Sequence, residues 1–268
     1  YNKRLKDSPR AHLHVGDARR FVRETPHKFD VVVGDLFHPA RDGAALMFTQ
    51  EHFEAIRARL RPNGVYSQWL PLYQMDADLL RMILRTFASA FSHVETWIAS
   101  YDEYPALALV GSQTPLTWSE DRVARPLDAN AELRTQLAAS AIREPQQLAF
   151  HFLADARALN RFMGDGPLNL DDHPRVLFDA PAFTYERGKP LDRTLRVLVN
   201  ETRNHMNPKR LAKRFGSKDT ELQNGFASRN RFLETYLLRA ELTIEEQTQG
   251  YINAAALSAD FTLATAYV

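Results

Sequence analysis

The chain has 268 residues, of which 44% are hydrophobic, so it can bury the core of one large domain or of one and a half. Its 34 Lys and Arg nearly balance its 33 Asp and Glu, which argues against a basic nucleic-acid-binding protein. The lack of cysteine excludes disulfides, thiolate metal sites and cysteine nucleophiles. The sequence shows neither a bilayer-spanning apolar stretch nor the apolar region of a signal peptide, so we expect a soluble, cytoplasmic domain.

Strand and helix signals alternate over about the first 115 residues, which predicts an α/β fold. Residues 11–15 predict a short strand that turns into a helix at Gly16 and Asp17. The sequence FDVVV at residues 29–33 contains a continuous β-branched run, typical of a parallel strand buried on both faces. We therefore expect residues 29–33 to form a central strand.

Five further elements complete the predicted α/β part. Residues 49–60 predict a helix and residues 64–70 a strand. A second helix begins after a capping aspartate, Asp76, and carries one broad apolar face. Residues 94–99 and 106–110 are joined by a short polar loop, so we expect them to form an antiparallel hairpin.

The remaining sequence is less regular. Residues 133–141 and 146–162 predict helices, and residues 175–178 predict a strand. Residues 181–218 contain ten Lys and Arg against three Asp and Glu, and this balance reverses over residues 219–268.

The change in composition predicts a boundary near Gly188 to Pro190. We expect an α/β domain at residues 1–185, including its helical and strand extension. Residues 190–268 then form a small helical C-terminal region.

Two aspartates follow predicted strands, each directly after a glycine: Asp17 after Gly16 and Asp35 after Gly34. Ligands of open parallel sheets bind beyond the carboxyl ends of the strands, so we expect both carboxylates to face one cleft. There they could accept a hydrogen bond from an adenine amino group, or bind and deprotonate an amine. The alternative is that each aspartate only caps a helix or a turn.

Three motifs occur in order along this part of the chain. They are HVGDA at residues 14–18, FDVVVGD at residues 29–35 with Pro39 after it, and LRPNGV at residues 60–65 with Gln68 after it. As a set they resemble the second half of the spermidine synthase catalytic domain, a relative of the Rossmann-like methyltransferases.

The resemblance covers about residues 9–111 and continues more weakly to residue 183. The first recognisable strand corresponds to the family's third, and the sequence has no G-x-G turn. The resemblance therefore implies a Rossmann-like methyltransferase-type sheet that is N-terminally truncated. One flank of that sheet would be uncovered, and a homodimer or a separate partner would cover it.

The resemblance also implies roles for single residues. Asp17 would accept from the adenine amino group of decarboxylated S-adenosylmethionine, and Asp35 would orient and deprotonate the attacking amine. The residues expected to bind the nucleoside are Gly16, Asp17, Gly34 and Leu36. Those expected to bind the amine are Gln68, His38, Tyr104 and Asp172. Decarboxylated S-adenosylmethionine, or S-adenosylmethionine itself, would be a co-substrate, and we expect no tightly bound cofactor and no metal.

The sequence departs from the family pattern around the acceptor site. The family has a second aspartate three residues after the first, and His38 stands there instead. This exchange removes an anion from a site for a dication, so polyamine affinity should fall. The loop before residue 106 lacks the family's glycine and tryptophan, although Asp102, Glu103 and Tyr104 could supply other contacts. The identity of the amine therefore stays open.

The sequence NLDDHP at residues 169–174 is similar to an N-T-D-D-x-P motif, with Leu170 in place of threonine. This motif occurs in spermidine-synthase-like domains fused to membrane segments, which implies that the full-length protein is attached to the inner membrane. Asp171, Asp172 and His173 could hold a divalent metal. We favour another arrangement, in which one aspartate caps the turn and the other faces the cleft.

A basic cluster at helical spacing consists of Lys209, Arg210, Lys213 and Arg214. It could contact anionic lipids or a nucleic-acid backbone, but a solvated helix face is the simpler interpretation. The first functional hypothesis is transfer of an aminopropyl group to a small-molecule amine. The alternatives are an S-adenosylmethionine-dependent methyltransferase with His38 in its acceptor site, and a non-catalytic binding module.

Overall fold

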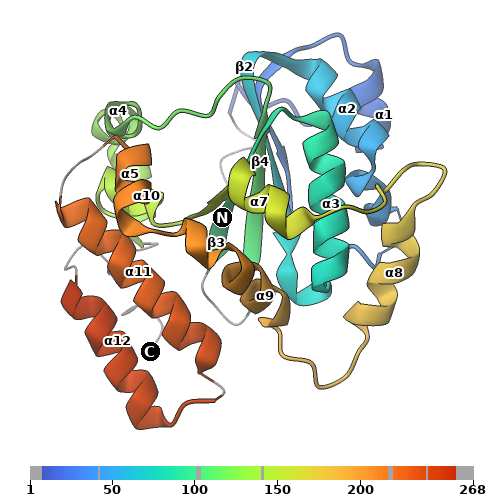
Figure 1. The fold of residues 1–268 in the computed structure, drawn as a ribbon. Helices are drawn as coiled ribbons and strands as arrows, with labels where there is room; N and C mark the ends of the chain where they lie inside the picture. Colours follow the sequence, from blue (N-terminus) through green and yellow to red (C-terminus); the bar gives the residue numbers. More distant parts are fainter. Residues whose placement is uncertain are drawn as a thin grey trace.

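A computed structural model describes residues 8–41, 43–100, 104–139, 142–216, 220–239 and 241–257 (Figure 1). Its centre is a five-stranded mixed sheet with strand order β1-β2-β4-β3-β5. The strands are β1 (Phe29–Gly34), β2 (Leu60–Pro71), β3 (His93–Ser100), β4 (Ala106–Ser112) and β5 (Phe152–Asp155). β1 and β2 are parallel, whereas β4 runs antiparallel to both β2 and β3. The predicted α/β fold of the Rossmann-like methyltransferase type is confirmed, and so is the antiparallel hairpin.

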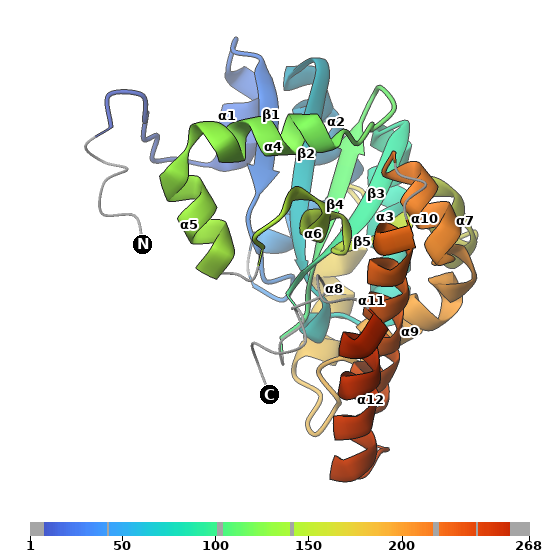
Figure 2. The ribbon, with the colours of Figure 1, turned by 90° about the vertical axis from the view of Figure 1, so that its left-hand side faces the viewer.

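Helices cover both faces of the sheet (Figures 1 and 2). One face carries α1 (Ala18–Glu24), α2 (Gln50–Arg59), α3 (Ala77–Ala90), α7 (Ala156–Met163) and α8 (Arg175–Thr184). The opposite face carries α4 (Glu120–Ala129), α5 (Ala131–Ala139) and α6 (Pro145–Ala149). Asp76 caps α3 as predicted, because its Oδ1 accepts a hydrogen bond from the main-chain nitrogen of Leu79 at 2.7 Å.

The strand predicted at residues 11–15 is not formed. These residues are irregular, and the apolar side chains of Leu13 and Val15 are exposed, Val15 at 98%. A strand forms only where its main-chain groups find a partner strand. Among the described residues none lies beyond β1 to pair with this segment.

The prediction that residues 29–33 form a central strand is also wrong. β1 lies at the edge of the described sheet, and two of its valines, Val31 and Val33, are exposed at 61% and 60%. Val32 points to the opposite face and packs against the core. The valine run therefore has one covered face, and β1 is an edge strand among the described residues.

Two predictions after residue 145 need correction. Residues 146–162 do not form one helix, because residues 152–155 form β5, which pairs with β3. The first three residues of β5 are buried. In the sequence, their apolar side chains are equally typical of the buried face of a helix. Residues 175–178 are the first turn of α8 and not a strand, since Val176 and Ala180 lie at helical spacing and are both buried.

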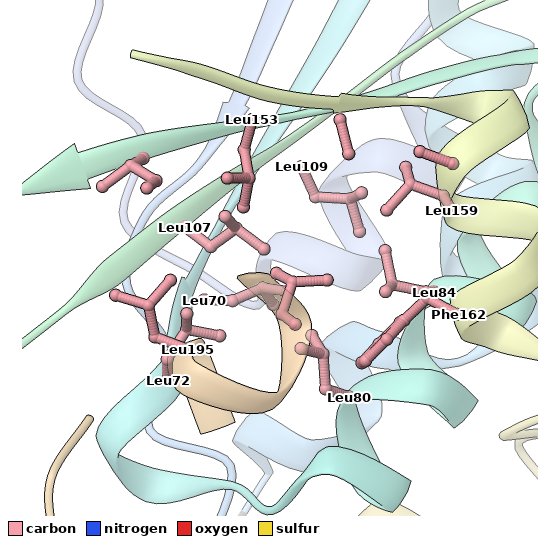
Figure 3. Close-up of a cluster of buried hydrophobic side chains, with 14 of the residues drawn as sticks. Leu70, Leu72, Leu80, Leu84, Leu107, Leu109, Leu153, Leu159, Phe162 and Leu195 are labelled. Atoms are coloured by element: carbon pink, nitrogen blue, oxygen red, sulfur yellow. The ribbon is translucent and has the colours of Figure 1, made fainter. Parts of the chain in front are cut away.

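The C-terminal region is helical, as expected, and contains α9 (Arg193–Thr202), α10 (Pro208–Arg214), α11 (Thr220–Leu238) and α12 (Ile244–Leu257). Its buried side chains join those of the α/β part in one cluster. Figure 3 shows Leu195 of α9 beside Leu70 of β2 and beside Leu72, which directly follows β2. The composition change near residues 188–190 therefore does not separate two hydrophobic cores.

The basic cluster of α10 contacts the sheet. Arg210 pairs with Asp155 at 2.7 Å, and Arg214 pairs with the buried Glu95. Burial raises the pKa of the Glu95 carboxyl, and the positive charge of Arg214 opposes this effect. Two of the four basic side chains thus attach α10 to the β3–β5 edge, while Lys209 and Lys213 are exposed.

In the part of the chain that the structure describes, no helix has both the length and the apolar character needed to cross a membrane.

Candidate active site

The carboxyl ends of β1 and β2 and the start of β4 lie together along one edge of the sheet. Gly34, the last residue of β1, is the register partner of Gln68 in the parallel strand β2. The start of β4 reaches the same edge, because the main-chain nitrogen of Leu72 donates to the carbonyl oxygen of Pro105 at 3.1 Å. Residues after β1, after β2 and before β4 are therefore neighbours here, as expected for a ligand site of an α/β sheet.

Asp35 is the first residue after β1, and its side chain is exposed. Its Oδ1 accepts a hydrogen bond from the main-chain nitrogen of Leu36 at 2.7 Å. Its main-chain carbonyl oxygen accepts a hydrogen bond from Nε2 of Gln68 at 3.1 Å. These two hydrogen bonds fix the turn, and the carboxylate remains exposed to solvent. This arrangement suits a group that must reach a substrate.

Gln68 is fully buried, at 0% exposure. Its Nε2 donates to the carbonyl oxygens of both Asp35 and Trp69, and its Oε1 accepts from the hydroxyl of Tyr66. Tyr66 is buried as well, and burial raises the pKa of its phenol, so the hydroxyl keeps its proton. Gln68, for which binding of the amine stays a prediction, thus holds the main chain at Asp35.

Gly34 is buried against the same pair of side chains. A Cβ atom at this position would lie 2.5 Å from Oε1 of Gln68 and 2.6 Å from the hydroxyl oxygen of Tyr66. Both distances are shorter than real Cβ contacts, so a larger residue would displace Tyr66 or Gln68. Glycine is therefore required here for packing, whether or not it also approaches a nucleoside.

His38 connects the ends of two strands. Its Nδ1 lies 2.9 Å from Oε1 of Gln74 in η2 (Leu72–Gln74), the single turn that follows β2. The ring is half-buried, between a Phe37 that packs against the core and a buried Pro39. Gln74 was not among the residues predicted for the site, because only its contact with His38 identifies it.

Two tyrosines form an aromatic contact at the same edge. The ring centroids of Tyr73 and Tyr104 are 5.3 Å apart, and the rings meet edge to face at 82°. Tyr104 is 52% exposed, so the ring borders solvent. Asp102 and Glu103, the other candidates in this loop, lie outside the described residues.

Asp17 caps α1, as the simpler interpretation proposed. Its Oδ1 accepts a hydrogen bond from the main-chain nitrogen of Arg20 at 3.0 Å, and this bond lowers the pKa of the carboxyl. Gly16 and Asp17 also line a surface pocket of about 600 Å³ together with His14 and Phe21. Asp35 is not among the residues that line this pocket.

The structure distinguishes the two neighbouring aspartates of the NLDDHP motif. Asp171 forms ion pairs with Arg19 and Arg23. Asp172 is 76% exposed and contacts His173, with Oδ1 and Nδ1 3.1 Å apart. Asp172, which is predicted to bind the amine, thus lies exposed at the surface. Across the described residues, no three His, Asp or Glu side chains are grouped in a way that could hold a metal ion.

Comparisons with known proteins match the region that contains this site. Residues 2–113 match the spermine/spermidine synthase domain. The chain is 30% identical over 115 residues, 41% of its length, to the polyamine aminopropyltransferase of a Synechococcus strain. It is 27% identical over 188 residues, 69% of its length, to the polyamine aminopropyltransferase of Nitrosomonas europaea. It is also 34% identical over 100 residues, 34% of its length, to the spermine synthase of Arabidopsis thaliana.

These matches cover 37%, 52% and 27% of the three relatives, so the chain spans about half of their length or less. The matched region contains α1, the parallel pair β1–β2 and the β3–β4 hairpin. The similarity and the mixed α/β fold together support the spermine/spermidine synthase family.

Proposed function

We propose that this chain is the catalytic part of a transferase that moves an aminopropyl group from decarboxylated S-adenosylmethionine to an amine. The observation that carries the proposal is the fixed main chain and the exposed carboxylate of Asp35. Its main chain is clamped by Gln68 at the carboxyl edge of a parallel strand, and its carboxylate is exposed there. The similarity of residues 2–113 to spermine/spermidine synthase domains supports the same activity.

The reaction requires a base at this position. The amine nitrogen attacks the carbon next to the sulfonium with its lone pair, the carbon–sulfur bond breaks, and the electron pair of that bond stays on the thioether sulfur. Alkyl amines are protonated near neutral pH, so a proton must leave the nitrogen before it can attack. Asp35 takes that proton, a contribution worth about 10²- to 10⁴-fold in rate.

The donor nucleoside occupies the pocket beside α1 in this proposal. The adenine amino group donates to Asp17, whose Oδ1 already accepts from Arg20. The rings of His14 and Phe21, with centroids 4.8 Å apart, supply an aromatic wall to the pocket. A flat, neutral base with an exocyclic amino group suits this combination of a carboxylate and aromatic rings.

The acceptor amine lies between Asp35 and the side chains that follow β2. His38 and Gln74 offer a hydrogen-bonded polar pair, and Tyr73 with Tyr104 offers apolar surface. The first carboxylate after β2, Asp76, is engaged as the cap of α3. Of the described carboxylates that directly follow β1 or β2, Asp35 is thus the one that can pair with an ammonium, which favours a monoamine over a diamine.

Product analysis of the full-length protein tests this function. Incubation with decarboxylated S-adenosylmethionine and a panel of primary amines should release methylthioadenosine and an aminopropylated amine. Release of S-adenosylhomocysteine from S-adenosylmethionine instead would identify a methyltransferase. If calorimetry detects binding of neither thioether, the chain is a non-catalytic module and the proposal fails.

A further inference from the structure

The segment that links α7 to α8 crosses the outer side of the helix layer. It leaves α7, passes over α3 and reaches α8 on the far side (Figure 1). Residues 169–171 of this segment, which we call the clasp, bond to α3, α2 and α1. They belong to the NLDDHP motif, for which the proposed reaction has no use.

Asn169 anchors the clasp inside the protein. It is completely buried, and its main-chain nitrogen donates to the hydroxyl of Thr86 in α3 at 2.9 Å. Its carbonyl oxygen accepts from the main-chain nitrogen of Gln50, the first residue of α2, at 2.9 Å. Its Oδ1 accepts from the main-chain nitrogen of Val176 at 3.1 Å. Three helices are thus fixed relative to this one side chain and its peptide groups.

Asp171 extends the clasp to α1. Its two carboxylate oxygens accept from Nη2 of Arg19 at 2.5 and 2.7 Å, and Oδ2 also accepts from Arg23 at 2.8 Å. Its main-chain nitrogen donates to Glu51 at 2.9 Å. Burial acts to raise the pKa of Asp171, but hydrogen bonds from Thr49 and the two arginines lower it overall, so the carboxylate is charged.

The position of α1 depends on few other contacts. The helix has seven residues, none of them fully buried, and a helix of this length is unstable alone. Its half-buried Val22 packs against the core near the C-terminal end. Its C-terminal end is held by Arg59, which donates to the carbonyl oxygens of Val22 and Arg23. Towards its N-terminal end, Arg19 connects it to Asp171. Loss of Asp171 would leave Arg19 with only its longer hydrogen bond to Thr49, at 3.4 Å, and would loosen the end of α1 that begins at Asp17.

We propose that Asp171 is a positioning residue, which fixes α1 through Arg19 and Arg23 so that Gly16 and Asp17 hold the donor nucleoside. This inference rests on the proposed function for the identity of the ligand. It assigns the first aspartate of the motif a task at the donor site and leaves the second, Asp172, without one.

The test compares Asp171→Asn with Asp172→Asn in the full-length protein. Both variants lose one carboxylate. Within the described residues, however, the ion-pair partner of Asp172 is His173, not an arginine of α1. We expect Asp171→Asn to weaken methylthioadenosine binding roughly tenfold by calorimetry and to raise the donor KM similarly, with kcat nearly unchanged. Amide hydrogen exchange in α1 should accelerate by a similar factor. Asp172→Asn should leave methylthioadenosine binding, the donor KM and hydrogen exchange in α1 as they are in wild type.

Two further variants separate positioning from general damage. Asp171→Glu restores a carboxylate and should recover part of the lost affinity. Arg19→Gln combined with Asp171→Asn should weaken binding little more than Asp171→Asn alone, because the loss of the Asp171 carboxylate already removes the ion pair with Arg19. Unchanged exchange in α1, or a fall in kcat with unaltered KM, would overturn the inference. If wild type binds no methylthioadenosine, the proposed function fails, while the exchange experiment still decides whether Asp171 holds α1.

Discussion

The side-chain amide of Gln68 in β2 donates a hydrogen bond to the main-chain carbonyl oxygen of Asp35, 3.1 Å away. Asp35 directly follows β1, the parallel neighbour of β2. A fully buried residue of β2 thereby fixes the turn that carries the exposed carboxylate. The bond also explains why glycine ends β1, since a Cβ at Gly34 would collide with Oε1 of Gln68.

Replacing Gln68 with leucine should destabilise the protein and loosen Asp35. The substitution leaves the carbonyl oxygens of Asp35 and Trp69 and the hydroxyl of Tyr66 without this partner. A buried group left without its partner costs about 1–3 kcal/mol, and the bonds to the two carbonyl oxygens are only part-buried, so they cost less. We therefore expect a total loss of roughly 2–4 kcal/mol in the free energy of unfolding, measured in urea.

The matched control is Gln113→Leu. Gln113 also bonds to a main-chain carbonyl, that of Ala90 at 2.9 Å, but lies at an exposed position. We expect it to lose less than about 1 kcal/mol, because water replaces the lost bond. Equal losses for Gln68→Leu and Gln113→Leu would show that the bond to Asp35 has no special importance.

Replacing His38 with aspartate should change the preferred acceptor. A second carboxylate three residues after Asp35 supplies a partner for a second ammonium group, so kcat/KM for a diamine should rise relative to that for a monoamine, by roughly tenfold. Product formation with both amines under identical donor concentrations measures this ratio. The control is His93→Asp, which makes the same change in charge. His93 begins β3 and pairs with Ser112 at the end of β4, whereas the candidate site lies at the start of β4, so the ratio should stay unaltered.

His52 should make the protein sensitive to acid. The side chain is buried, and neither ring nitrogen has a hydrogen-bond partner among the described residues. Burial, followed by the positive charges of Arg19 and Arg23, lowers the pKa of His52 to about 4, while Asp171 and Asp17 act to raise it. Because the unfolded chain then binds the proton more readily, stability is fully present above pH 6.5 and falls as the pH drops towards 4.

This loss amounts to about 3 kcal/mol between pH 6.5 and 4, the equivalent of the difference between the two pKa values. Urea unfolding at several pH values measures it in wild type and in His52→Phe, which should lack this part of the pH dependence. His173→Phe, at an exposed position, is the control. A His52→Phe variant with the same pH dependence as wild type would assign the acid sensitivity to other groups.

Local signals in the sequence were sufficient for the elements that depend on near neighbours. Asp76 predicts the start of α3, and the short loop between residues 100 and 106 predicts the β3–β4 hairpin. The position of a strand within the sheet depends on partners elsewhere in the chain. For this reason β1 was placed in the centre, and the four residues of β5, which pair with β3, were assigned to a helix.

The same limit applies to the candidate site. Asp35 could be identified because it directly follows an apolar strand. The choice between Asp171 and Asp172 depends on Arg19 and Arg23, which are 152 and 148 residues from Asp171 in sequence. No local pattern carries that information, and Gln74 was likewise revealed through its contact with His38.

The turnover number of Asp35→Asn tests the central claim most directly. The substitution keeps the size of the side chain, and an amide oxygen can still accept from the main-chain nitrogen of Leu36, but the amide cannot take a proton from the amine. Measured as methylthioadenosine release by the full-length protein at saturating amine, kcat should fall at least about 100-fold, with calorimetric affinity for methylthioadenosine unchanged. Turnover equal to that of wild type would show that Asp35 is not the base.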